Sequence, residues 1–164
     1  IYSGLSVLDP IWTTALVTGI HGYMVFDTLY GLDHSGQVHP QMCAGHDVST
    51  DGLTWTFTLR DGLMFHDGER VLAKDCVASV RRWGSRDSFG QPLMAATNEI
   101  EALDDRRFRI HLKRPFGQML YGLGARGCVV MPERIAKTPG TEQVKEAVGS
   151  GPDRKSTRLN SSHT

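Results

Sequence analysis

Two arginines and three aromatic residues have side-chain types that could contact a ligand carrying a carboxylate. Arg82 and Arg86 lie four residues apart, and Trp83 and Phe89 flank the polar stretch around Arg86. A guanidinium group can bind a carboxylate through two parallel N–H donors, and an aromatic ring offers apolar contact beside it. The pattern predicts ligand contacts from these four residues and from Tyr23. The competing interpretation is that Tyr23 and Trp83 are core aromatics and that the arginines are solvated.

A glycine-rich stretch offers a second kind of chemistry. Residues 122–127, Gly-Leu-Gly-Ala-Arg-Gly, fit the pattern GxGxxG. A dinucleotide loop needs a strand before it and a helix opening at its end, so that helix-terminal N–H groups meet the phosphates. Here a helix is predicted before the glycines and a short strand after them. We therefore interpret the stretch as a connection.

Motifs for hydrolysis and metal binding are missing from the sequence. It contains no GxSxG and no HExxH, and the acidic pair Asp104-Asp105 falls in a predicted turn. The histidines show none of the close pairs typical of zinc sites. We expect no catalytic residue, no metal and no cofactor. A small metal- or nucleotide-using enzyme domain stays open as the alternative function.

Composition limits the partners. Lys plus Arg and Asp plus Glu number 18 each, so the formal net charge is zero, which argues against a nucleic-acid surface. The sequence has no apolar run of the length needed to span a membrane. The cysteines at positions 43, 76 and 128 form no CxxC pair. They are predicted to be small buried side chains, and one disulfide remains possible.

Residues 51–83 are the best-defined stretch of the chain. Trp55, Phe57 and Leu59 alternate with threonines, which predicts a half-buried strand with Trp55 and Phe57 in the core. Asp-Gly turns follow at 61–62 and 67–68. The period then changes to that of a helix with two faces. The apolar face holds Ala73, Cys76, Val77, Val80 and Gly84, and the wet face holds Lys74, Asp75, Ser79, Arg81 and Arg82.

Shorter elements surround this stretch, and together they indicate an α/β (mixed α+β) fold. A helix capped by Thr13 or Thr14 should run to about residue 26. The strands are expected at both ends of 27–39, at 46–48, 100–103, 108–112 and 129–130. The other helices are expected at 93–96, 115–123 and 132–137, and a polar loop at 84–92.

The strand, turns and helix of 51–83 carry a family resemblance. "DGLTWTFTLRDGLMFHDG", followed by "AKDCVASVRRW", resembles the signature of the family 5 extracytoplasmic solute-binding proteins, which are the peptide-, dipeptide-, nickel- and opine-binding components of ABC importers. Weaker matches are "LDP" at 8–10 and "GSGP" at 149–152. One departure is Leu72, which stands where the family usually has a threonine N-cap, and we expect a small loss of stability from it.

The resemblance implies part of a two-lobed protein. Residues 1–40 would enter lobe I, 41–148 would form lobe II, and 149–152 would return toward lobe I. The fold would then be a periplasmic-binding-protein-like lobe with a mixed sheet and flanking helices, incomplete relative to the whole. In the resembled family the segment after "LDP" borders the cleft, which adds Trp12 and Thr13 to the candidate ligand contacts.

The implied function is solute binding without catalysis. The protein would deliver a peptide or similar small solute to the permease of an ABC transporter by hinged closure of two lobes. It would be periplasmic, monomeric and free of nucleic acid, with no signal peptide in this sequence. Residues 153–164 lack the family's continuation and are expected to be foreign to the fold. An unstable lobe that leaves an apolar face open is a further alternative.

Overall fold

The sheet is built on β4 (Thr54–Leu59), whose alternating sequence gives it one apolar face. In the computed structural model, which describes residues 6–153, β4 pairs with β3 (Cys43–Val48) and with β6 (Arg107–Leu112). The fourth strand, β5 (Thr97–Ala102), pairs with β6 at the edge. The order is β3-β4-β6-β5, and every pairing is antiparallel, so the sheet is not the mixed sheet that the resemblance implied.

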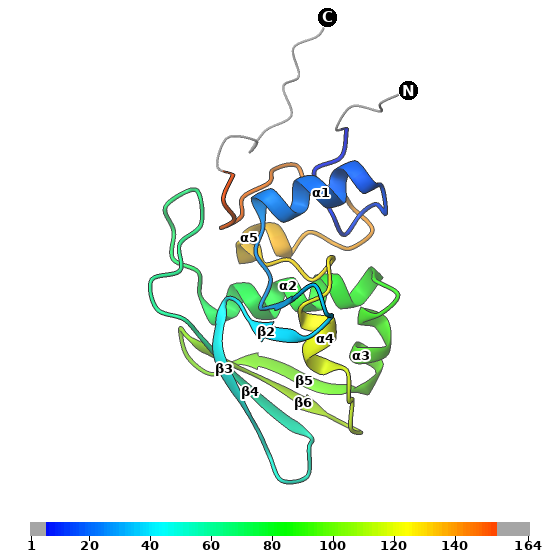
Figure 1. The fold of residues 1–164 in the computed structure, drawn as a ribbon, viewed down its shortest axis with the longest axis vertical. Helices are drawn as coiled ribbons and strands as arrows, with labels where there is room; N and C mark the ends of the chain where they lie inside the picture. The colour runs from blue at the N-terminus through cyan, green and yellow to red at the C-terminus, as the bar shows by residue number, and fades with distance from the viewer. Residues whose placement is uncertain (1–5, 154–164) are drawn as a thin grey trace, which may run out of the picture.

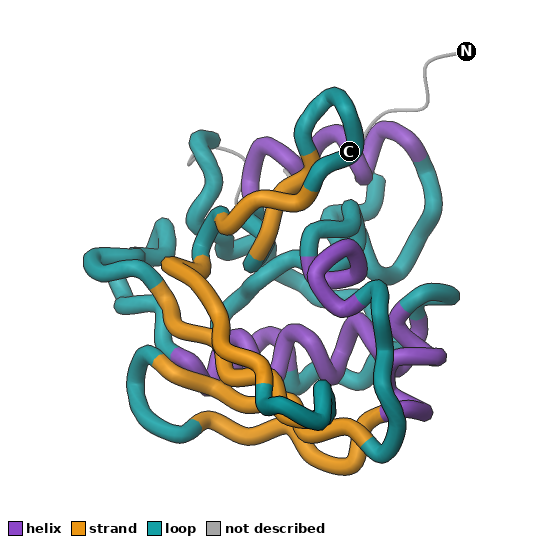
Figure 2. The backbone as a smooth tube through the Cα atoms, turned by 60° about the horizontal axis from the view of Figure 1, so that its bottom comes forward, coloured by secondary structure: helices purple, strands orange, loops and turns teal. Residues whose placement is uncertain are grey.

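Helices cover one face of this sheet, as Figure 1 shows. The longest is α2 (Ala73–Arg86), which lies along the sheet, and α3 (Gly90–Ala96) follows it. In Figure 2 the four strands come forward as a layer separate from the helices behind them. The fold is therefore of the mixed α and β class that the sequence predicted.

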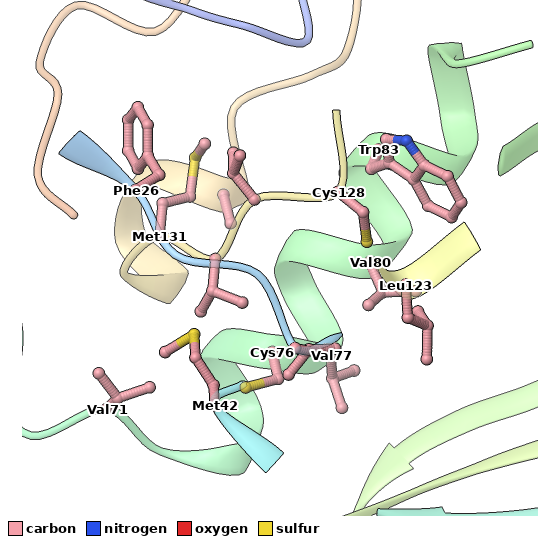
Figure 3. Packing of buried hydrophobic residues seen from close by; sticks show 14 of the residues in the cluster. Phe26, Met42, Val71, Cys76, Val77, Val80, Trp83, Leu123, Cys128 and Met131 are labelled. Carbon is pink, nitrogen blue, oxygen red and sulfur yellow. The ribbon is translucent and has the colours of Figure 1, made fainter. Parts of the chain in front are cut away.

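The core fills the space between α2 and the sheet. Phe57 and Phe108 are fully buried and stack with their ring centroids 5.0 Å apart, because β4 and β6 place them opposite each other. Trp55, predicted to be a core residue, is only half-buried and stacks on His46 at the end of the layer. Figure 3 shows how the core continues along α2, where Cys76 lies near Met42 and Val80 lies near Leu123.

One of the two faces predicted for α2 differs from expectation. Its apolar face is buried as predicted, but Asp75, Ser79 and Arg82 are buried as well, with 5%, 1% and 3% exposure. Only Lys74 and Arg81 of the predicted wet face are exposed. The helix is covered on two sides because the chain from residue 131 to 144 lies along its polar side.

Polar groups on α2 hold that covering segment. The Asp75 carboxylate accepts hydrogen bonds from Leu72 N at 2.8 Å and Glu133 N at 2.7 Å, so it serves the first N–H groups of two helices. Ser79 Oγ donates to Met131 O and accepts from Met131 N. Burial raises the pKa of the Asp75 carboxyl, against the effect of its two N–H donors. The Asp75 carboxylate thus makes the N3 half of a capping box, and the N-cap half that a threonine hydroxyl would make is missing at Leu72.

The remaining elements are shorter than the sequence suggested. Helix α1 spans Leu16–Val25, hairpin strands β1 and β2 span Tyr30–Leu32 and Val38–Pro40, and helices α4 and α5 span Met119–Leu123 and Glu133–Ala136. The N-cap of α1 is Ala15, not Thr13 or Thr14; the Thr13 hydroxyl instead accepts a hydrogen bond from Ala15 N. The predicted loop 84–92 is helical except at 87–89, and Val129 forms an isolated bridge to Thr28 instead of a strand.

Residues 153–164 were predicted to be foreign to the fold. Of these, Asp153 is described, and residues 154–164 lie outside the described residues. Asp153 N donates to Met24 O. None of the helices within residues 6–153 is both long and apolar enough to cross a membrane.

We expect Phe57→Ala to lower the free energy of unfolding by about 3–5 kcal/mol, because it empties a buried site against Phe108. Urea denaturation followed by circular dichroism measures the change. The control is Val48→Ala on the neighbouring strand, where the side chain is 42% exposed and the loss should stay below about 1 kcal/mol. Equal losses in the two variants would contradict the placement of the core.

The three cysteines should be unreactive until the protein unfolds. Cys43, Cys76 and Cys128 are buried and unpaired, so the disulfide that the sequence left open is not formed. Burial raises the pKa of the Cys43 thiol to about 12 and raises the pKa values of the other two thiols also. At pH 8, an aromatic disulfide reagent should label no thiol rapidly in the native protein and three in guanidinium chloride. Rapid labelling of any thiol without denaturant would contradict this burial.

Candidate functional site

The seven predicted ligand contacts fall into three groups in the structure. Trp12, Thr13 and Arg86 lie together at one surface, Tyr23 stands alone on α1, and Arg82, Trp83 and Phe89 face inward. The first group is the candidate site. Each group is fixed by a different part of the chain.

The turn after Leu8 places Trp12 at the surface. The Asp9 carboxylate accepts a hydrogen bond from Ile11 N at 3.0 Å, and Trp12 N donates to Asp9 O at 3.2 Å, so residues 9–12 form a tight turn. The Arg86 guanidinium lies over the Trp12 ring, 4.5 Å from its centroid, and donates to Trp12 O at 3.1 Å. This cation–π pair stacks a cation on an aromatic ring at the surface.

Arg82 has a different role from the one the sequence suggested. Its Nη1 and Nη2 bind both oxygens of Asp9, at 3.1 and 2.7 Å, with side chains that are 1% and 0% exposed. Its other donors reach Thr138 O and Glu142 O, while Asp9 also accepts from Val144 N. The predicted bidentate partner is thus a carboxylate of the same chain. The pair joins the start of the chain, α2 and residues 138–144.

Trp83 and Phe89 belong to the packing of the α2–α3 corner. Trp83 is fully buried, and its ring centroid lies 6.4 Å from that of Phe89. Phe89 is half-buried, between Phe116 and Tyr121. In this arrangement neither ring offers an open face for a solute. Trp83 is therefore a core aromatic, as the competing interpretation of the sequence stated.

Tyr23 is the opposite case, because it is 59% exposed. It belongs to an apolar stripe on α1 together with Leu16, Ile20 and Met24, all exposed. The buried side of α1 is formed by Thr18, Gly19, His21, Gly22 and Val25. The signal was present in the sequence, since these four positions follow helical spacing and the glycines lie between them.

Glycines explain why α1 turns its small side inward. A Cβ added at Gly22 would lie 3.2 Å from Pro10 Cβ, and one added at Gly19 would lie 2.9 Å from Arg126 Cζ. At Gly22 the helix therefore packs closely on Pro10 of the turn that carries Asp9, and a larger residue at this position would push the helix away. The apolar stripe is left on the outer side.

The stretch 122–127 is a connection, as predicted. Helix α4 ends at Leu123, so the glycines close a helix and do not open one. A Cβ at Gly122 would lie 2.6 Å from Phe89 Cε1, and one at Gly127 would lie 3.2 Å from Trp83 Nε1. Close packing against these two aromatic rings accounts for glycine at both positions. Within residues 6–153, no three His, Cys, Asp or Glu side chains gather to hold a metal ion.

Comparison with known proteins identifies the class. The model of the bacterial extracellular solute-binding proteins, family 5 (middle region), matches residues 37–152. The chain belongs to this family, which is one of binding proteins and not of enzymes. The family that the strand–turn–helix stretch suggested is confirmed.

Two named proteins are similar to this chain in sequence. The chain is 48% identical over 148 residues to y4tO of Sinorhizobium fredii (strain NBRC 101917 / NGR234), named "Probable peptide ABC transporter periplasmic-binding protein". The match covers 90% of this chain and 28% of y4tO. It is 28% identical over 152 residues to the glutathione-binding protein GsiB of Salmonella typhi, covering 92% of this chain and 30% of GsiB. The chain thus spans less than a third of these relatives.

Solved structures support the fold. The periplasmic binding protein AgaA of A. tumefaciens R10, in complex with agropinic acid, matches with a TM-score of 0.75 and 26% identity, over 90% of this chain and 30% of AgaA. DppA of Helicobacter pylori, in complex with the peptide STSA, matches with a TM-score of 0.73 and 26% identity, over 90% of this chain and 34% of DppA. Residues 6–153 therefore form part of a periplasmic-binding-protein fold.

We expect Asp9→Asn to lower the free energy of unfolding by about 3–5 kcal/mol, because it leaves the Arg82 charge buried without its partner. Urea denaturation measures the loss. The matched control is Asp104→Asn, which breaks the exposed ion pair with Arg107 and should leave the denaturation midpoint nearly unchanged. If the two variants unfold at the same urea concentration, the buried pair is not the anchor described here.

Proposed function

We propose that this chain is part of a periplasmic protein that binds a peptide or similar small solute and delivers it to an ABC transporter permease. The observation that carries the proposal is the 48% identity, over 90% of the chain, to a protein named as a peptide ABC transporter periplasmic-binding protein. The DppA match, a structure in complex with a peptide, supports the same class of ligand. The protein acts as a monomer, without a cofactor.

The lobe boundaries are part of the proposal. Residues 1–40 belong to the start of lobe I, 41–148 to lobe II, and 149–152 to the return. Two contacts support a crossing point between the first and last segments, since Gly151 N donates to Val25 O at 3.0 Å and Ser150 Oγ donates to Asp27 Oδ2 at 2.8 Å. Chain segments that enter and leave a lobe side by side suit a hinge.

The proposed solute contacts are now Trp12, Thr13, Arg86 and Tyr23. The Trp12 ring and the Arg86 cation form one surface, which could meet both an apolar side chain and a carboxylate. Arg82 acts through Asp9 on the turn that carries Trp12. Trp83 and Phe89 pack inside the α2–α3 corner and are no longer among the proposed contacts.

Isothermal titration with di- to pentapeptides tests the ligand class. The full-length protein that carries this segment should bind such peptides, whereas the 164-residue chain alone should not reach micromolar affinity. The reason is that the family's closure mechanism requires contacts from two lobes, and the chain spans less than a third of its relatives. Micromolar binding by the chain alone would contradict the division of the site, and no binding by the full-length protein would contradict the function.

In the full-length protein, Trp12→Ala should weaken peptide binding about tenfold, because it removes the aromatic face below Arg86. Leu103→Ala is the control, since Leu103 is an exposed apolar residue that follows β5 and is not among the proposed solute contacts. Its affinity should equal that of the unchanged protein. A Trp12→Ala variant with unchanged affinity would remove Trp12 from the site.

A further inference from the structure

A groove runs along the side of α2 that faces α5 and the residues after it. Its volume is about 400 Å³, within the range of small-molecule sites. The apolar part of its lining, which we call the floor, consists of Val77, Ala78, Ala102, Ala136 and Pro139. We call it the α2–α5 groove.

The rim of the α2–α5 groove is basic. Lys74, Arg81 and Lys137 border it, and the one acidic residue among its lining is Glu133. Glu133 is held between Lys137 at 2.9 Å and Lys74 at 3.8 Å, and these cations lower the pKa of its carboxyl. Arg82 also lines the groove, but its charge is matched by Asp9.

One carboxylate therefore faces three cations, and the rim keeps a net positive charge. Arg81 contributes most directly, because it is exposed and none of the described carboxylates forms an ion pair with it. One of its N–H groups donates to Ile100 O, which fixes the guanidinium at the edge of the groove. Its remaining donors can bind a carboxylate.

The main-chain groups that border the groove do not favour a peptide. Thr138 O already accepts a hydrogen bond from Arg82, and Gly140 O accepts one from Arg86. An extended peptide needs backbone partners for its own N–H and C=O groups. A ligand with an aliphatic body needs none, and an apolar floor suits it.

We propose that the α2–α5 groove binds an aliphatic monocarboxylate, with its chain on the floor of Val77, Ala78 and Ala136 and its carboxylate at Arg81 and Lys137. This site is separate from the surface of Trp12 and Arg86. It does not depend on the solute-binding proposal above, since the groove lies entirely within the described residues of this chain.

Titration of the ¹⁵N-labelled 164-residue chain with octanoate tests the proposal. Saturable shifts of the backbone amide signals should be confined to residues 74–85, 102 and 133–140, with a dissociation constant of about a millimolar or lower. Octylammonium, which has the same chain and the opposite charge, should bind at least about tenfold more weakly. N-acetyl-Leu-Leu, a carboxylate with a peptide main chain, should also bind more weakly than octanoate.

Variants separate the charge from the floor. Arg81→Gln and Lys137→Gln should each weaken octanoate binding about fivefold, and Ala78→Leu, which fills the floor, should abolish it while the amide spectrum stays folded. Lys113→Gln is the control, because Lys113 is exposed and not part of the groove lining. Scattered shifts, equal binding of octylammonium, stronger binding of N-acetyl-Leu-Leu, or full affinity in the three groove variants would each overturn the assignment.

Discussion

The buried ion pair between Asp9 and Arg82 is the interaction on which the other contacts depend. Two charges removed from water are tolerated only when each keeps its partner and its remaining hydrogen-bonding groups are satisfied. Both conditions hold here, because Asp9 also accepts from Ile11 N and Val144 N, and Arg82 also donates to two main-chain carbonyls. Three chain segments distant in sequence are held at one point. The turn of Trp12, and with it the candidate solute surface, follows from that point.

Helix α2 gives the body its shape because it is buried on two chemically different sides. The apolar side packs on the sheet through dispersion and the hydrophobic effect, which tolerate small shifts. The polar side binds residues 131–144 through Asp75, Ser79 and Arg82, whose hydrogen bonds require defined positions. The first side explains why the chain forms this layer. The second explains why the covering segment, which has little regular structure of its own, has one arrangement.

The sequence predicted what depends on local pattern. The alternation around Phe57, the turns at Asp-Gly and the apolar stripe of Cys76 and Val80 require only neighbours in sequence, and all are present. It could not predict that Arg82 is buried, because its partner is 73 positions away and an unpaired arginine belongs in water. It also predicted too long a loop after α2, since the polar residues there form the last turn of one helix and the loop into the next.

The outward stripe of α1 brings the fold and the proposed function together. Leu16, Ile20, Tyr23 and Met24 stay exposed because the opposite side of the helix packs inward, with Gly22 close to Pro10 of the Asp9 turn and Gly19 close to Arg126. Exposed apolar side chains gathered on one helix mark a surface suited to contact with another body. The same helix ends at Val25, where residues 149–151 return beside it. The ion pair, the candidate surface of Trp12 and the crossing of the chain are thus packed around one helix. For a protein proposed to work by closing two lobes, a movement of α1 would reach the site through the Asp9 turn.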